Sequence, residues 1–203
     1  MEIMTVNQNA LFMKKFITLS LLLITLFGCN GESQEKTKEE KMKEIIAANK
    51  ADVDLLMGST PKEFSAKTVD GSLFKSSENK GKYWIIFVYQ NSYLKKSESY
   101  DLVAELNATH QKYGSQFPMI GIVNGFSDDP AKMTKSITEA KFNFKQIDNT
   151  QGPEKEEEVN ENVYCTPAKI LIDPAGKVIY NGCGGKTETF NVLLDSLVRT
   201  NKM

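Results

Sequence analysis

Thiol chemistry is the reactive chemistry that this 203-residue chain most directly offers, through three cysteines, Cys29, Cys165 and Cys183. A cysteine acts as a nucleophile in its thiolate form, and it exchanges disulfides through a mixed-disulfide intermediate. The single histidine, His110, lies late in a helical pattern with no evident acidic or cysteine partner, so we expect it at the surface. These few residues argue against a histidine-rich metal site, and we expect neither a metal nor a cofactor.

Cys29 follows a segment typical of an export signal. Lys14 and Lys15 precede the apolar run 16-FITLSLLLITLFG-28. A short basic region followed by such a run is typical of a secretory signal rather than a membrane span. The residues 26-LFGC-29 resemble the lipobox of bacterial lipoproteins, in which the cysteine becomes the lipidated first residue of the mature protein. In the alternative interpretation, Cys29 is an incidental end of the apolar run.

This resemblance divides the chain into a signal, a tether and a domain. Residues 1–29 would be the signal, with translation starting at Met1 or Met13, and several acyl chains on one residue would anchor the protein stably. Residues 30–57 are polar and charged, as in a solvated tether, and Leu55 and Leu56 are among the residues that suggest a partly helical segment. We therefore expect a lipoprotein of the bacterial cell envelope, facing the periplasm or the cell surface.

The pattern from residue 58 to residue 203 predicts one α/β domain. Alternating apolar residues around Asp70-Gly71, a strong turn signal, predict a β-hairpin. Continuous apolar runs predict buried strands, helical spacing predicts amphipathic helices, and a βαβ unit requires parallel strands with a right-handed crossover. The expected strands are 83–89, 117–123, 144–147, 168–173 and 177–182, and the expected helices are 102–113, 130–140 and 190–198.

Two segments of this domain resemble the thioredoxin-like superfamily. They are 60-TPKEFSAKTVDGSLFKSSENKGKYWIIFVY-89 and 163-VYCTPAKILIDPAGKVIYNGCGG-185. The likeness is closest to membrane-anchored extracytoplasmic thioredoxins and to the alkyl hydroperoxide reductase/thiol-specific antioxidant branch. It implies a thioredoxin-like α/β fold, a mixed central sheet flanked by helices, with an extra N-terminal β-hairpin. It also implies that Pro167 is a cis-proline and that Thr166 and Pro167 border a substrate groove.

The chain departs from this family at the position of its redox dithiol. The alignment places the family's C-x-x-C motif on Ser92-Tyr93-Leu94-Lys95, and the peroxidatic cysteine has no counterpart either. A serine hydroxyl cannot form a mixed disulfide, so the standard reaction is excluded at this position. Lys95 and Lys96 would attract an anion if they lay at a helix N-terminus, although solvated lysines are the simpler interpretation.

Cys165 and Cys183 lie on the two strands of the predicted second hairpin. If Ile172 faces Val178, then Cys183 lies opposite Pro167, and the two cysteines are diagonal neighbours on one face. Diagonal neighbours are about 7–8 Å apart, the long edge of what a disulfide spans. Three interpretations stay open: two free thiols, a structural disulfide, or a redox-active pair.

The sequence leaves two hypotheses for function. In the first, a lipid-anchored thioredoxin-like protein without the standard dithiol serves as a scaffold that binds an extended peptide or an envelope protein. In the second, it is a thiol–disulfide oxidoreductase that uses Cys165 and Cys183. The near-balanced charge argues against a nucleic-acid partner, and the acidic run 154-EKEEE-158 is best interpreted as a solvated face. The sequence does not predict the oligomeric state.

Overall fold

The computed structural model describes residues 37–40, 52–153 and 159–200. Residues 38–40 are helical, and the amide of the preceding Thr37 donates to the Glu40 carboxylate at 2.8 Å. The predicted signal with Cys29, most of the predicted tether and the acidic run 154–158 lie outside the described residues. All further description concerns the packed unit from residue 52 onward.

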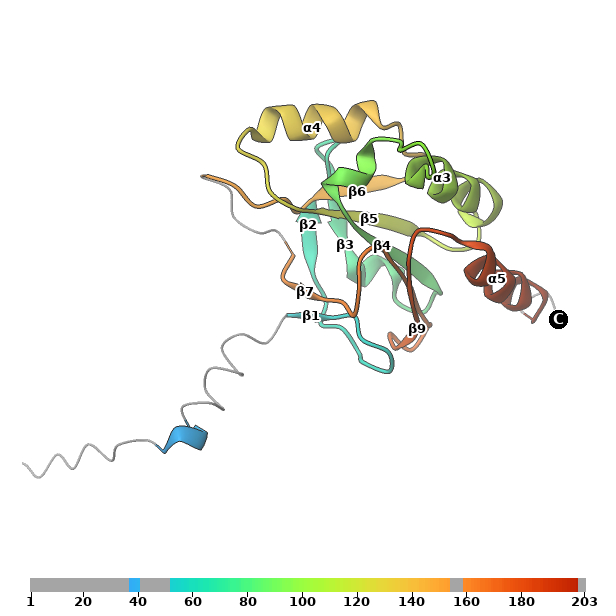
Figure 1. Cartoon of the computed structure of the whole chain (residues 1–203). Helices are drawn as coiled ribbons and strands as arrows, with labels where there is room; N and C mark the ends of the chain where they lie inside the picture. The colour runs from blue at the N-terminus through green and yellow to red at the C-terminus, as the bar shows by residue number, and fades with distance from the viewer. Residues whose placement is uncertain (1–36, 41–51, 154–158, 201–203) are drawn as a thin grey trace, which may run out of the picture. The chain divides into compact units, whose positions relative to one another are not determined.

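A five-stranded mixed sheet forms the centre of this unit (Figure 1). Its strand order is β6-β5-β4-β8-β9; β4 pairs in parallel with β5, as does β5 with β6, whereas β8 is antiparallel to both β4 and β9. This arrangement confirms the predicted βαβ unit followed by an antiparallel hairpin. The strands are β4 (Trp84–Gln90), β5 (Met119–Asn124), β6 (Lys145–Asp148), β8 (Ala168–Ile172) and β9 (Val178–Cys183).

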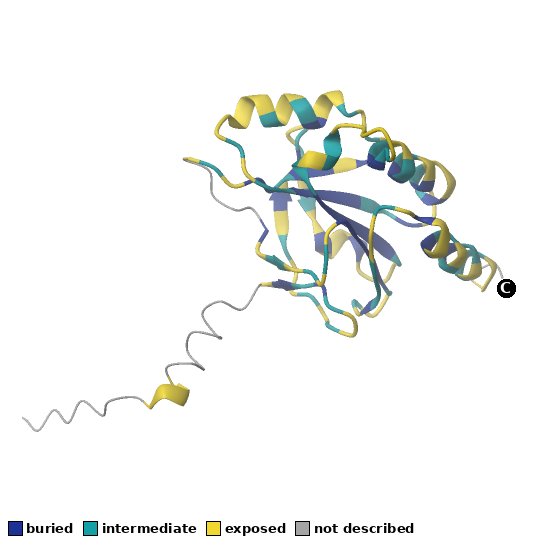
Figure 2. Ribbon diagram, in the orientation of Figure 1, coloured by how far each residue is buried: buried dark blue, intermediate teal, exposed yellow. Residues whose placement is uncertain are grey.

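The central strand β4 is apolar from Trp84 to Tyr89 because both of its faces are covered (Figure 2). The helices are α3 (Leu102–Tyr113), α4 (Pro130–Glu139) and α5 (Glu188–Thr200). Their buried apolar residues join one cluster with Ile85, Phe87 and Tyr89 of β4. The alternate β4 residues join a second cluster with the N-terminal strands on the opposite face.

The predicted N-terminal hairpin is present, and it lies beside the β6 edge of the sheet. Strands β2 (Ser65–Lys67) and β3 (Leu73–Lys75) are antiparallel, and the short 3₁₀ helix η1 (Ser76–Asn79) follows them. The turn depends on Gly71, whose φ of 84° is a conformation that favours glycine. Thr68 forms a bridge to Ile147, which places the hairpin beside β6.

One strand pair was not predicted. Strand β1 (Val53–Asp54) pairs in parallel with β7 (Glu161–Asn162), and Val53 and Leu55 are buried. The packed unit therefore includes residues that the sequence placed in the tether, and the expected start of the domain at residue 58 is too late. Leu55 and Leu56 are not helical, because one is buried beside β1 whereas the other lies in a bend.

Candidate functional site

The register of the sheet gathers most of the predicted site residues at one edge. Val88 of β4 pairs with Ala168 of β8, and Ala168 pairs with Cys183 at the end of β9. On the other side, Gln90 pairs with Asn124 at the end of β5. The segment that follows β4, the loop before β8 and Cys183 therefore meet at the same edge of the sheet.

The segment after β4 is not part of helix α3, whose bounds agree with the predicted helix 102–113. It forms one 3₁₀ turn, η2 (Asn91–Leu94), and the backbone is extended at Lys95, with φ −101° and ψ 131°. Helix α3 begins only at Leu102, where the Asp101 carboxylate caps it by accepting from the Ala104 amide at 3.0 Å. Ser92 and Lys95 are exposed and precede α3 rather than forming its first turn, so an anion site at an α-helix N-terminus is not built here.

The loop before β8 has the backbone that the family resemblance implied. The Thr166–Pro167 peptide bond is cis. Pro167 is buried, whereas Thr166 is exposed at the edge of the sheet. Tyr164, two residues before Thr166, has 80% of its surface exposed, although large aromatic side chains are usually covered.

Cys165 and Cys183 are joined by a disulfide, with a Cα–Cα separation of 5.7 Å. Cys183 is exposed, and Cys165 packs partly against the core. The predicted register was wrong by one residue: Ile172 faces Val178 as expected, but Leu171 faces Tyr180, so Cys183 lies opposite Ala168 rather than Pro167. The expected diagonal distance of 7–8 Å was therefore also wrong, and the pair lies within the ordinary range for disulfides.

The residues around the Cys183 end of β9 are held by side chains that the sequence did not single out. Lys169 is buried, and its amino group donates to the carbonyls of Cys183, at 3.1 Å, and of Gly184. Burial lowers the pKa of Lys169, while nearby Glu105 acts in the opposite direction. A lysine inside the apolar run 168-AKILID-173 was the sequence signal for this contact.

The next residues are held from the α3 side. Glu105 accepts from the Thr187 amide at 2.8 Å and from the Thr187 hydroxyl at 2.7 Å. Gly185 lies under the Tyr100 ring so closely that a Cβ there would stand 1.7 Å from the Tyr100 hydroxyl oxygen. The start of α3 and the segment after Cys183 are thus packed together.

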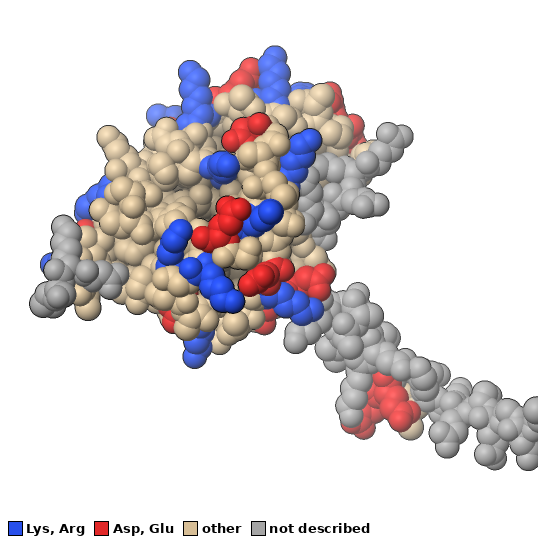
Figure 3. All heavy atoms as spheres, turned by 180° about the vertical axis from the view of Figure 1, so that it is seen from behind, with Lys and Arg blue, Asp and Glu red and all other residues tan. Residues whose placement is uncertain are grey.

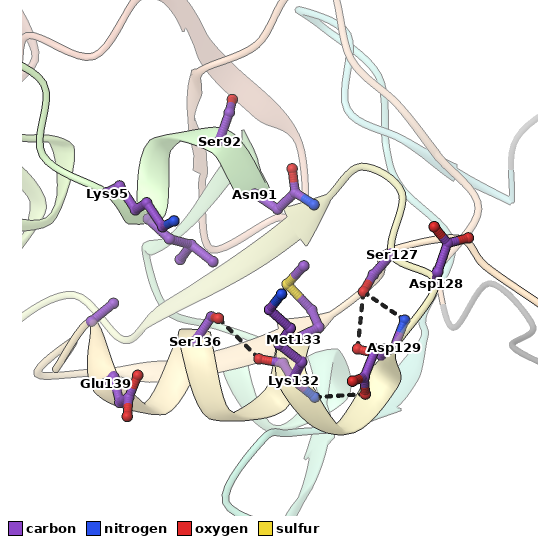
Figure 4. Close-up of a pocket in the computed structure, with 12 residues that line it drawn as sticks. Asn91, Ser92, Lys95, Ser127, Asp128, Asp129, Lys132, Met133, Ser136 and Glu139 are labelled. Carbon is purple, nitrogen blue, oxygen red and sulfur yellow. Dashed lines mark hydrogen bonds between the residues drawn. The ribbon is translucent and has the colours of Figure 1, made fainter.

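A pocket of about 560 Å³ lies between η2 and α4 (Figure 4). Ser92 and Lys95 are among its lining residues, but Thr166, Pro167 and the two cysteines are not. The structure therefore separates the predicted site residues into two neighbouring places, one beside the disulfide and one beside α4. The full lining comprises Asn91, Ser92, Leu94, Lys95, Ser127, Asp128, Asp129, Lys132, Met133, Ser136, Glu139 and Ala140.

His110 is half-buried rather than fully at the surface, and its ring stacks on Phe144 with the centroids 5.4 Å apart. Burial lowers the pKa of His110. Within residues 37–40, 52–153 and 159–200, no group of three His, Cys, Asp or Glu side chains is placed to hold a metal ion. The helices in these same ranges are too short or too polar to cross a membrane.

Charge on the surface is mixed in sign. Figure 3 shows lysine and acidic side chains next to one another over the face opposite to that of Figure 1. Ion pairs on the surface, such as Lys112–Asp195 at 3.1 Å and Lys186–Glu105 at 3.9 Å, follow the same pattern. Such pairs contribute little to stability individually.

Comparisons with solved structures show similarity to proteins described as thiol–disulfide oxidoreductases. One is a protein from Chlorobium tepidum that is described as a thiol:disulfide interchange protein DsbE. It is 16% identical to this chain, with a TM-score of 0.52, and the match covers 71% of this chain and 97% of that chain. The C-terminal domain of a protein described as a thiol-disulfide oxidoreductase from Bacteroides thetaiotaomicron is 19% identical with a TM-score of 0.51, over 70% and 98%. A thiol-disulfide oxidoreductase from Bacteroides fragilis is 19% identical with a TM-score of 0.50, over 66% and 98%.

These similarities show that the chain has a thioredoxin-like fold. No protein-family model and no curated protein sequence matches the chain. Identities below 20% carry the fold and not the activity, because function depends on the residues of the site.

Proposed function

We propose that the protein is a thioredoxin-fold binding module of the bacterial cell envelope, anchored by a lipid on Cys29. It would hold an extended peptide or a protein segment beside Thr166 and Pro167, without thiol exchange at Ser92 and Lys95. The observation that carries this proposal is the exposed backbone of Thr166. In the described part of the chain, no backbone hydrogen bond reaches the amide or the carbonyl of Thr166.

Free backbone groups beside a strand are what an extended peptide needs for recognition. Such a peptide pairs its own amide and carbonyl groups with unpaired backbone groups of the protein, and neighbouring side chains add selectivity. Tyr164 and Phe126, which expose 80% and 62% of their surfaces, flank the same edge of the sheet from the β8 and β5 sides. Exposed aromatic residues at such a position favour contact with apolar side chains of a partner.

A second candidate function rests on the exposed disulfide. A partner thiolate would attack the Cys183 sulfur, which is on the exposed side of the bond, and the Cys165 thiolate would leave. A second partner thiolate would then attack the mixed disulfide and release Cys183. The partner would become a disulfide, and the Cys165–Cys183 pair would carry the two electrons and become a dithiol.

Insulin reduction by dithiothreitol distinguishes the two candidates. We expect the full chain to accelerate this reaction no more than the Cys165→Ser/Cys183→Ser variant, because Ser92 and Lys95 cannot form a mixed disulfide. Turbidity from the released insulin B chain gives the rate. Acceleration by the wild-type chain that the double variant lacks would replace the first candidate with the second.

Peptide binding itself is measured with carboxymethylated insulin B chain, an unfolded polypeptide without thiols. We expect saturable binding that Tyr164→Ser weakens, since this change removes the most exposed aromatic contact beside Thr166. Val192→Ser is the matched control, because Val192 is 66% exposed on α5. Absence of saturable binding, or equal effects of the two substitutions, would contradict the proposal.

Lipid anchoring is tested separately, because Cys29 lies outside the described residues. Cys29→Ala is expected to move the protein from the membrane fraction to the soluble fraction, since the acyl chains supply the anchor. Mass spectrometry of the wild-type protein should show the acyl groups. A variant that still floats with membranes, together with a wild-type mass lacking acyl groups, would rule out the lipid.

A further inference from the structure

The pocket between η2 and α4 has the size of a small-molecule site. Its volume of about 560 Å³ lies within the range of roughly 300–1,000 Å³ that ligand sites occupy. One wall comes from η2 and the extended Lys95, and the other comes from α4 and the residues before it. The chain leaves its helical turn after Leu94 and does not become helical again until Leu102.

Two lysines give the pocket its unneutralised charge. Figure 4 shows the side chains of Lys95 and Lys132 extending into the space between η2 and α4. Across the residues that the structure describes, neither lysine forms an ion pair. Their positive charge is therefore available to a ligand in the pocket.

None of the three acidic residues of the lining forms an ion pair with these lysines in the described part of the chain. The Asp129 carboxylate caps α4 and accepts from the Lys132 amide at 2.9 Å. Glu139 pairs with Lys135 at 3.7 Å, and in Figure 4 its carboxylate lies on the side of α4 away from η2. Asp128 is directed away from the space between η2 and α4 in the same view.

Apolar side chains complete the pocket. Met133 lies in the space between η2 and α4 in Figure 4, and Leu94 and Ala140 line the same pocket. Met133 and Leu94 are only partly buried, so each has surface left to cover. A ligand that fits this lining combines an anionic group with an apolar body, because each part then meets its own kind of surface.

We propose that this pocket binds a small organic anion, with its carboxylate or phosphate group between Lys95 and Lys132 and its apolar body against Met133 and Leu94. The proposal does not depend on peptide binding beside Thr166, since the pocket shares no lining residue with that loop. It also requires no thiol. The position that holds the redox dithiol in the family would then serve as one wall of a binding site.

The test uses the full chain with ¹³C-methyl methionine, so that the Met133 methyl resonance reports directly from the pocket. Phenyl phosphate and phenylacetate are the probes, and they distinguish a phosphate group from a carboxylate. Inorganic phosphate carries the charge without the apolar body, and benzyl alcohol carries the ring without the charge. We expect saturable shifts of the Met133 methyl with at least one of the two probes, and weaker binding of inorganic phosphate and of benzyl alcohol.

Substitution of the two lysines shows whether their charge holds the anion. Lys95→Met/Lys132→Met is expected to weaken binding of the better probe roughly tenfold, as the loss of two exposed charge pairs implies. Lys67→Met/Lys75→Met is the matched control, because both lysines are exposed on the N-terminal hairpin and neither lines the pocket. The proposal is overturned by the absence of saturable shifts, by unchanged affinity in the double variant, or by inorganic phosphate or benzyl alcohol binding as tightly as the probes.

Discussion

Replacing both Cys165 and Cys183 with serine is expected to lower the free energy of unfolding by about 3 kcal/mol. The bond joins residues that are 18 apart in the sequence, and closing a loop of this length restricts the unfolded chain. In the folded chain the two Cα atoms are 5.7 Å apart, which is within the range of Cα–Cα separations that disulfides span. Urea unfolding followed by circular dichroism measures the difference.

Chemical reduction provides the matched control. Dithiothreitol should destabilise the wild-type chain by a similar amount and leave the double-serine variant unchanged, because that variant has no bond to lose. Equal stability of the reduced and oxidised wild-type chains would contradict the prediction.

The midpoint potential of the same bond bears on its function. A structural disulfide typically has a potential below about −300 mV, whereas oxidoreductases with exchangeable pairs lie between about −270 and −120 mV. Titration against glutathione measures this midpoint potential. It therefore shows whether the bond is structural, as in the proposed binding module, or exchangeable, as in the proposed oxidoreductase. The stability measurement applies in both cases, because it depends on loop closure rather than on reactivity.

The central strands were predictable from the sequence because burial on both faces leaves a plain signal. Trp84 to Tyr89 are all buried, and the sequence shows six consecutive apolar or aromatic residues there. Asp70-Gly71 specified its turn in the same direct way, since only a few residue pairs suit that backbone. The residues that form each of these elements are adjacent in the sequence, so their pattern alone predicts the element.

The register of the second hairpin was not predictable because one residue was inserted into the ladder. Counting from the turn assumed that every residue of β9 has a partner, but the pairing shifts between Ile172 and Leu171. A bulge of this kind depends on packing across the sheet rather than on residue type. The proximity of Cys165 and Cys183 was still predicted, because a shift of one residue leaves both at the same edge.

The pocket beside α4 was not predicted because its two walls, η2 and α4, are far apart in the sequence and only the fold brings them together. The cap at Asp101 was visible in the sequence as an acidic residue directly before the apolar pattern of α3. The helix start at Leu102 was therefore predicted, but no local pattern shows that Lys95 and Lys132 line one pocket. Strands β1 and β7 could not be found at all, since two-residue strands have no periodicity.

Phe190→Ala is expected to lower the free energy of unfolding by about 3–5 kcal/mol, the range for deleting a buried aromatic side chain. Phe190 is fully buried at the start of α5. Its ring lies 5.0 Å from that of Tyr180 on β9 and 6.3 Å from that of Phe87 on β4. The substitution leaves a cavity between the helix and two strands, and neither strand can move to fill it without breaking the sheet.

The control for this change is Val192→Ala, which removes apolar atoms from the same helix where 66% of the side chain is exposed. We expect its effect to stay within about 0.5 kcal/mol, as for most surface substitutions. Small domains have total stabilities of about 5–15 kcal/mol, so Phe190→Ala should remove a large share. Similar costs for Phe190→Ala and Val192→Ala in urea unfolding would mean that α5 does not pack on the sheet as described. The segment from Cys183 to Thr187 would then be held by its contacts with Lys169, Glu105 and Tyr100 rather than by α5.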